Sequence, residues 1–239
     1  MKSNLITRGR ALFVALGTLA LAGASGTSHA TLSLYDAAIA ADNGGGLPYT
    51  AVLTSSSSVD TTNAIAFDFG AVSGSSTAEF IISGDPVGGG RDGYLAVGSN
   101  STWNLRYEQW DDTAQMGFTH LGVADYLFVP SVTTPTDTTH VAYRWDQPTS
   151  TMELYLNGDL AGSQTAAGFE MPTGAGFLGN NAGLTEGMLG TFERVTVYDS
   201  AVDPTVIKGH ANAWLAVPEP SATLLIALAA SALPFRRRR

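Results

Sequence analysis

Apolar and polar residues alternate along two neighbouring stretches in the second half of this 239-residue chain. Val141–Asp146 (VAYRWD) and Met152–Asn157 (MELYLN) both repeat with a period of two, which is typical of a strand with one buried face. Gln147–Thr151 between them has turn chemistry, and Asn157-Gly158 is a strong hairpin signal because both residues tolerate positive φ. The pattern predicts an antiparallel meander over His140–Ser163.

The rest of the chain predicts further short strands separated by loops rich in Gly, Ser and Thr. Trp103–Trp110 is expected to be half-buried, with Trp103, Leu105 and Tyr107 on one face and polar side chains on the other. Loops are expected over Asp42–Pro48 and Ser55–Ser58. The other predicted strands are Leu32–Tyr35, Ala64–Phe69, Ala78–Ser83, Tyr94–Val97, Asp125–Val129, Phe177–Gly179 and Met188–Tyr198, the last with a bulge near Phe192 and Val195.

A helix is predicted only near the end of this region. Asp203-Pro204 is a good helix start, with Asp as N-cap and Pro at the first helical position. Val206, Ile207, His210, Ala211 and Trp214 then fall on one helical face. The predicted fold is an all-β, two-sheet antiparallel jelly-roll sandwich with a short C-terminal helix. The chain has no cysteine, so the core must stabilise it without disulfides.

The N-terminus has the pattern of a secretory signal peptide. Lys2, Arg8 and Arg10 precede an apolar run, and Ser28-His29-Ala30 supplies the small residues of a cleavage site. A membrane anchor is the alternative, but the run is shorter than the roughly 20 residues that a span requires. We expect residues 1–30 to be a signal peptide and the domain to occupy residues 31–216.

The C-terminus, residues 217–239, has an equally distinctive pattern. Pro218-Glu219-Pro220 precedes the apolar run Ser221–Leu233, and Arg236, Arg237, Arg238 and Arg239 end the chain. Arginines that follow an apolar segment stay cytoplasmic, which places the domain outside the inner membrane. This order resembles the PEP-CTERM sorting signal. The resemblance implies a short transmembrane run, cleavage by the membrane enzyme exosortase, and export to the cell surface or extracellular matrix (biofilm) of a Gram-negative bacterium; an ordinary membrane anchor is the alternative.

The region between the two ends is strongly acidic. Residues 31–216 contain five of the 12 basic residues and 20 of the 21 acidic residues, a net charge near −15. Such a surface disfavours nucleic acid and anionic lipid as partners. It is compatible with divalent cations, although solubility alone explains an acidic surface.

Four short motifs occur in an order that resembles the laminin G, or concanavalin A-like lectin/glucanase, signature. They are His140-Val141-Ala142, the Tyr155–Gly158 hairpin, Leu178-Gly179 and the final strand that ends in Tyr198-Asp199 before a helix. The resemblance extends from about Phe80 to Trp214. It implies a concanavalin A-like sandwich with calcium ligands in its loops, and, with the C-terminal motif, similarity to laminin G-like proteins that exosortase systems export.

The sequence contains no catalytic motif that we can identify. Glucanases of this superfamily carry Glu-x-Asp-x-Glu, because two carboxylates must flank one glycosidic bond. Glu108 and Asp111 are the nearest pair here, and an offset of three places them on different faces of a strand. Gly88–Gly93 formally matches G-x-G-x-x-G but precedes a strand pattern rather than a helix. We expect a non-enzymatic protein, with a glycoside hydrolase as the least favoured alternative.

Binding residues are sought in loops, where exposed side chains can reach a ligand. Trp110 followed by Asp111 and Asp112 could stack on a sugar and bond its hydroxyls, and Asn180 lies in another predicted loop. Asp92 and Asp125 are candidate ligands for Ca²⁺, the only cofactor expected. We expect polysaccharide or surface glycans as partners. A purely structural module that engages other matrix proteins is the alternative.

Overall fold

The computed structural model describes residues 32–85, 93–100, 102–109 and 114–216. The chain divides into two compact units, and the larger, Ala38–Asn212, contains every strand of the described residues. The smaller unit has 32–37 and 213–216 as its described residues, where the first helix begins and the last helix ends. The predicted signal peptide and sorting tail, including Pro218, Glu219, Pro220 and Arg236 to Arg239, lie outside the described residues.

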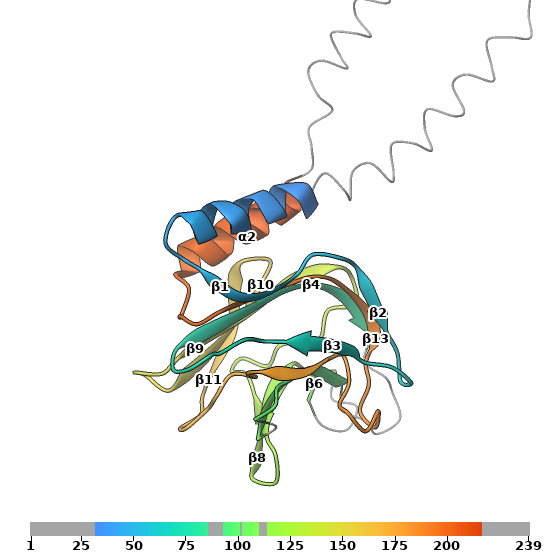
Figure 1. The fold of residues 1–239 in the computed structure, drawn as a ribbon. Coiled ribbons are helices and arrows are strands. Elements are labelled where there is room, and N and C mark those ends of the chain that lie inside the picture. Colours follow the sequence, from blue (N-terminus) through green and yellow to red (C-terminus); the bar gives the residue numbers. More distant parts are fainter. Residues whose placement is uncertain (1–31, 86–92, 101, 110–113, 217–239) are drawn as a thin grey trace, which may run out of the picture. The chain divides into compact units, whose positions relative to one another are not determined.

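Two antiparallel sheets face each other in the larger unit (Figure 1). One has the order β1-β13-β4-β9-β10-β11, with β2 also paired to β13, and the other β3-β12-β5-β6-β7-β8. The first sheet contains β1 Tyr49–Leu53, β2 Ser57–Val59, β4 Ser76–Asp85, β9 Thr139–Asp146, β10 Thr151–Leu156, β11 Asp159–Thr165 and β13 Leu189–Tyr198. The second contains β3 Ile65–Asp68, β5 Gly93–Val97, β6 Trp103–Glu108, β7 Gly117–His120, β8 Ala124–Leu127 and β12 Ala175–Leu178. The predicted two-sheet sandwich is confirmed.

The predicted meander forms β9, β10 and β11. Leu154 pairs with Tyr143 of β9 on one side and with Gly162 of β11 on the other. Asn157 (φ 51°) and Gly158 (φ 78°) both adopt the left-handed conformation that the tight turn requires. A side chain at Gly158 would also collide with Lys208 and Ala211. The bulge predicted near Phe192 is present in β13, where the pairing with β4 shifts between Phe192 and Arg194.

The structure corrects the prediction at the start of the domain. Leu32–Tyr35, predicted to be a strand, begins a helix over residues 32–44, which also includes part of the predicted loop. Leu32, Tyr35 and Ile39 are its buried apolar residues, and their spacing of three and four is helical. This helical period was not predicted, because Leu32 and Leu34 alternate over too short a window. Ser57 and Ser58, predicted as loop, form part of β2, and β1 and β7 were not predicted.

The predicted C-terminal helix is α2, Pro204–Leu215. Asp203 caps it, because its Oδ1 accepts a hydrogen bond from Thr205 N at 2.8 Å. Hydrogen bonds from the Thr205 hydroxyl and backbone lower the pKa of Asp203. Ile207, His210 and Ala211 are buried, as their common face predicted. In the described part of the chain, no helix is both long enough and apolar enough to span a membrane.

Aromatic side chains fill the space between the sheets. Phe169 joins the two layers, since its ring centroid is 5.0 Å from that of Trp145 on β9 and 5.1 Å from that of Trp103 on β6. Phe118 on β7 also packs edge-on against Phe169 at 5.4 Å. Fully burying such side chains supplies the dominant stabilising term of a domain that lacks disulfides.

Candidate functional site

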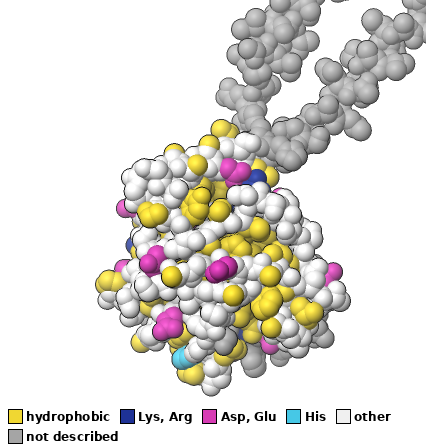
Figure 2. Space-filling model, in the orientation of Figure 1, with side chains coloured by type: hydrophobic (Ala, Val, Ile, Leu, Met, Phe, Trp, Pro, Cys, Tyr) yellow, Lys and Arg dark blue, Asp and Glu magenta, His cyan; other side chains and the backbone are white. Residues whose placement is uncertain are grey.

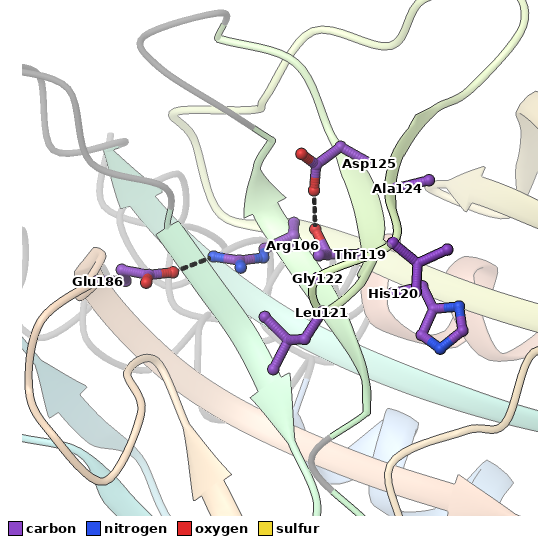
Figure 3. Close-up of a pocket in the computed structure, with 9 residues that line it drawn as sticks. Arg106, Thr119, His120, Leu121, Gly122, Ala124, Asp125 and Glu186 are labelled. Atoms are coloured by element: carbon purple, nitrogen blue, oxygen red, sulfur yellow. Dashed lines mark hydrogen bonds and ion pairs between the residues drawn. The ribbon is translucent and has the colours of Figure 1, made fainter.

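A hollow of about 310 Å³ lies at β6, β7 and β8 of the six-stranded sheet. Figure 3 shows the side chains that surround it, with Arg106 and Glu186 on one side and Thr119 and Asp125 on another. The described residues that line it are Arg106, Thr119, His120, Leu121, Gly122, Val123, Ala124, Asp125 and Glu186. Three strands, one hairpin turn and one loop contribute to this lining, so residues far apart in sequence meet there.

The polar face of β6 supplies Arg106, which is 2% exposed. Its Nη1 donates to Glu186 Oε2 at 2.6 Å, and its guanidinium carbon lies 3.7 Å from the centroid of the Tyr94 ring on β5. Stacking on an aromatic face and pairing with a carboxylate together fix a guanidinium in one position. Burial raises the pKa of Tyr94, and the charge of Arg106 partly opposes that rise. Arg106 therefore forms a fixed donor beside the hollow.

The backbone of β6 beneath Arg106 is held from the opposite sheet. The hydroxyl of Tyr143 on β9 crosses the core and donates to Arg106 O at 2.6 Å, with Gly117 O 3.1 Å away. Burial, with a smaller contribution from Tyr107, raises the pKa of Tyr143 well above its usual value, so this hydroxyl remains a donor. The meander that identifies the fold thus also positions the floor of the hollow.

Glu186 is placed by a loop that Asn180 organises. Asn180 Oδ1 accepts from Asn181 N at 2.9 Å and from Glu186 N at 3.2 Å, and its Nδ2 donates to Asn63 O at 3.3 Å. Gly187 leaves room for this amide, because a Cβ there would lie 2.5 Å from Asn180 Nδ2. Asn180, predicted to bind ligand, is fully buried and acts on the hollow through Glu186.

Asp125, predicted as a calcium ligand, does line the hollow. Its Oδ1 accepts from the Thr119 hydroxyl and from Gln109 Nε2, both at 2.7 Å. Its Oδ2 has no hydrogen-bond partner in the described residues. No group of three or more His, Asp or Glu side chains that could hold a metal occurs among the residues described. The calcium site therefore stays a prediction.

The other predicted site residues cannot be placed. Trp110, Asp111, Asp112 and Asp92 lie outside the described residues, as does most of the glycine-rich Gly88–Gly93. Of the predicted site residues, the structure brings only two to the hollow. Asp125 lines it, and Asn180 holds the loop that carries Glu186.

Three residues that line the hollow were not predicted as site residues: Arg106, Thr119 and Glu186. Arg106 was assigned to the solvent face of a half-buried strand, and that expectation was wrong, because all six residues of β6 are buried. The signal that could have identified it is the presence of an arginine in a strand of a domain with only five basic residues. No local pattern marks Glu186.

Two further polar residues of β6 are buried on the same face as Arg106. Glu108 is 2% exposed, and its Oε1 accepts from Ala114 N at 2.8 Å, so it fastens the chain after β6. Asn104 is fully buried, and neither polar atom of its side chain has a hydrogen-bond partner in the described residues. Buried amides are rarely left unsatisfied, and such cases are concentrated at functional sites.

A second buried cluster lies on the outer face of the seven-stranded sheet and includes His140 and His210. Glu79 of β4 is fully buried; its Oε2 lies 2.9 Å from His140 Nε2 and both its oxygens lie 3.0 Å from His210 Nδ1. His210 Nε2 is 2.8 Å from Asp42 Oδ2. Burial alone would raise the pKa of Glu79, but hydrogen bonds from the two histidines outweigh it and the pKa is lowered.

The same contacts raise the pKa of His210. Burial would lower the pKa of His210, but hydrogen bonds and charge from Glu79, and then from Asp42, raise it. The Tyr198 ring stacks on the imidazole, with 6.3 Å between centroids. Through Glu79 the cluster joins His210 of α2 to His140 of β9 in the seven-stranded sheet.

The face of the molecule drawn in Figure 2 has more acidic than basic side chains, in agreement with the composition. Figure 2 shows Asp and Glu side chains dispersed over the visible face, with few Lys or Arg among them. Hydrophobic atoms are scattered between them on the same face.

Comparison with solved structures gives remote similarities. The NanB sialidase of Streptococcus pneumoniae is 15% identical with a TM-score of 0.47, over 67% of this chain and 28% of that one. Domain 4 of the GH43 extracellular arabinanase AbnA of Geobacillus stearothermophilus, solved with arabinotriose, is 16% identical with a TM-score of 0.49, over 65% and 76%. The Ruminococcus gnavus IT-sialidase CBM40 bound to alpha2,3 sialyllactose is 17% identical with a TM-score of 0.42, over 58% and 83%.

No curated protein matches the chain significantly. A family model does match: the laminin G model of the concanavalin A-like lectin/glucanases superfamily aligns with residues 54–208, most of the sandwich. The two antiparallel sheets and the order of the short motifs agree with that match. This chain therefore belongs to the concanavalin A-like lectin/glucanases superfamily.

Proposed function

We propose that this protein is an exported, non-catalytic surface or matrix protein that binds extracellular polysaccharide or surface glycans in the hollow at β6–β8. The observation that carries the proposal is the fixed pair of Arg106 and Glu186 at the edge of this hollow. It presents hydrogen-bond donors and acceptors side by side, which is what recognition of sugar hydroxyls requires. Asp125 adds a further acceptor across the hollow.

The absence of catalysis is part of the proposal. A glycosidase needs one carboxyl group as acid and a second as nucleophile or base. Of the carboxylates near the hollow, Glu186 is paired with Arg106, and Asp125 is bonded to Thr119 and Gln109. Glu108 is buried and bonded to backbone. Sugar release that is lost in Glu108→Gln would contradict this part of the proposal.

Export and processing rest on the two ends of the chain. We propose that residues 1–30 are removed as a signal peptide, that residues 31–216 form the surface domain, and that exosortase cuts the 217–239 tail near Pro218 after a transient stage in the inner membrane. The support is the order of the Pro-Glu-Pro motif, apolar run and arginine cluster. Intact mass of the exported protein tests both cleavages.

Glycan binding is tested with the full chain on an array that includes polysaccharide from the producing cell's own matrix, with and without a calcium chelator. We expect binding that Glu186→Gln weakens at least about tenfold, since it removes the charge facing Arg106. Glu153→Gln is the matched control, because Glu153 is also half-buried and paired with an arginine, Arg144, at 2.8 Å in the other sheet.

Three outcomes would decide the matter. Weaker glycan binding by Glu186→Gln, with unchanged binding by Glu153→Gln, supports the hollow as the glycan site. Equal loss in both variants contradicts that location. If no glycan binds with or without chelator, the proposed function is wrong. The alternative, a structural module that engages other matrix proteins, is then tested by capturing matrix proteins on the immobilised chain. A loss of binding with chelator would support the proposed Ca²⁺.

A further inference from the structure

One side of the hollow is apolar. The turn between β7 and β8 contributes Leu121, Gly122, Val123 and Ala124 to its lining. Leu121 is 42% exposed and Val123 is 69% exposed, the largest exposed fraction among the large hydrophobic side chains that the structure describes. Gly122 (φ 72°) adds no side chain, and a Cβ there would meet nothing within 4 Å. In Figure 3 the side chain of Leu121 points towards the side of the hollow where Arg106 and Glu186 lie.

The turn is held in place, so the apolar side chains keep a fixed position. Leu121 N donates to Thr102 O at 2.8 Å, and Val123 N donates to His120 O at 2.9 Å. The His120 ring stacks on buried Trp103 with 4.1 Å between centroids. A preorganised apolar wall loses little conformational entropy when a ligand contacts it. Single exposed apolar residues are common, but these two share one turn beside a polar floor.

The polar floor favours a ligand that donates hydrogen bonds and has no negative charge. Two carboxylates, Glu186 and Asp125, face one cation, Arg106. Asp125 Oδ2 is an acceptor without a partner in the described residues, and exposed oxygens of Glu186 retain lone pairs. The acidic surface adds to the repulsion of anions. An acidic sugar is therefore disfavoured, and a neutral sugar with free hydroxyls fits.

We propose that the hollow selects neutral sugars that carry a methyl group, such as 6-deoxyhexoses and N-acetyl amino sugars. This inference rests on the proposed glycan-binding function and adds the class of sugar to it. Hydroxyl groups bond the floor at Asp125 and Glu186, while the methyl group contacts Leu121 and Val123. Removing one methyl group from water contributes enough to bind the methylated sugar about fourfold more tightly than its counterpart.

The test compares sugars that differ in the methyl group, with dissociation constants measured by NMR titration of the full chain. L-fucose is paired with L-galactose, its 6-hydroxylated counterpart, and N-acetylglucosamine is paired with N-formylglucosamine, which lacks only the methyl group. Glucuronic acid against glucose tests the expected exclusion of acidic sugars. We expect about fourfold preference for L-fucose and for N-acetylglucosamine, and weaker binding of glucuronic acid than of glucose.

Two variants test whether the preference for methylated sugars depends on the apolar turn between β7 and β8. Val123→Ser should reduce the fourfold preference to nearly none and keep binding of L-galactose. Val129→Ser is the matched control, because Val129 is 67% exposed and does not line the hollow; it should leave the preference unchanged. Equal affinities within each pair, or a preference that survives Val123→Ser, would overturn the inference while glycan binding stands. If no sugar binds at all, the proposed function fails with it.

Discussion

Glu79→Gln removes one negative charge from the centre of the buried histidine cluster and keeps the shape of the side chain. The carboxylate is fully buried and bonded to His140 at 2.9 Å and to His210 at 3.0 Å. A glutamine has one oxygen acceptor in place of two carboxylate oxygens. One of the two histidines therefore loses its acceptor, and His210 loses the stronger of its two charged partners.

The expected cost follows from these contacts. Hydrogen bonds to charged groups contribute about 1.5 to 3 kcal/mol each, and breaking a buried ion pair by removing one partner costs about 3 to 5 kcal/mol. We expect a loss of about 3 kcal/mol in the free energy of unfolding. For a domain of this size the loss corresponds to a decrease of about 6 to 12 °C in Tm.

The pH dependence gives a second readout. The pKa of His210 is raised, so its stabilising contribution is complete below the ordinary value of 6.5 and is lost as pH rises through the raised value. The pKa of Glu79 is lowered, so its contribution is complete above the ordinary value of 4.5 and is lost as pH falls through the lowered value. The cluster should stabilise the domain most between pH 4.5 and 6.5, and Glu79→Gln should flatten the decline in Tm between pH 6 and 9.

Thermal unfolding of the full chain, followed by circular dichroism from pH 4 to 9, measures both effects. Glu153→Gln serves as control, because Glu153 is a half-buried carboxylate paired with Arg144 and should cost less than about 1 kcal/mol. The reasoning is refuted if Glu79→Gln lowers Tm no more than Glu153→Gln does and its Tm still declines between pH 6 and 9. The buried cluster would then not stabilise the domain as the distances indicate.

Two glycines and one asparagine give further predictions, all read from Tm by thermal unfolding. Gly209→Ala should raise stability by about 0.5 to 1 kcal/mol, because Gly209 lies within α2 and a Cβ would meet nothing within 4 Å; no increase would contradict this. Gly190→Ala should cost about 1 to 3 kcal/mol, because its Cβ would lie 2.2 Å from Ser83 O, and an unchanged Tm would refute the clash. Asn104→Leu should raise Tm, because it removes a buried amide without a partner among the described residues, and a lower Tm would contradict this reasoning.

The meander shows what local pattern can determine. Period-two alternation and the two turn signals predicted three strands joined by two turns, and β9, β10 and β11 form with Asn157 and Gly158 in the left-handed conformation. Short apolar runs were less informative. The Leu32–Tyr35 segment is too short to distinguish a period of two from the helical period, and Ile39, which extends the helical face, lay beyond the predicted strand.

The sequence by itself determined the fold class, the terminal helix with its Asp203 cap, the acidic surface and the order of motifs that places the chain in its superfamily. These properties depend on residues near one another or on composition. Only the tertiary structure decided that both faces of β6 are buried, that Arg106 meets Glu186 eighty residues away, and that Glu79 holds His140 and His210. Contacts between sheets and loops depend on how distant segments fold back on one another, and no local spacing encodes them.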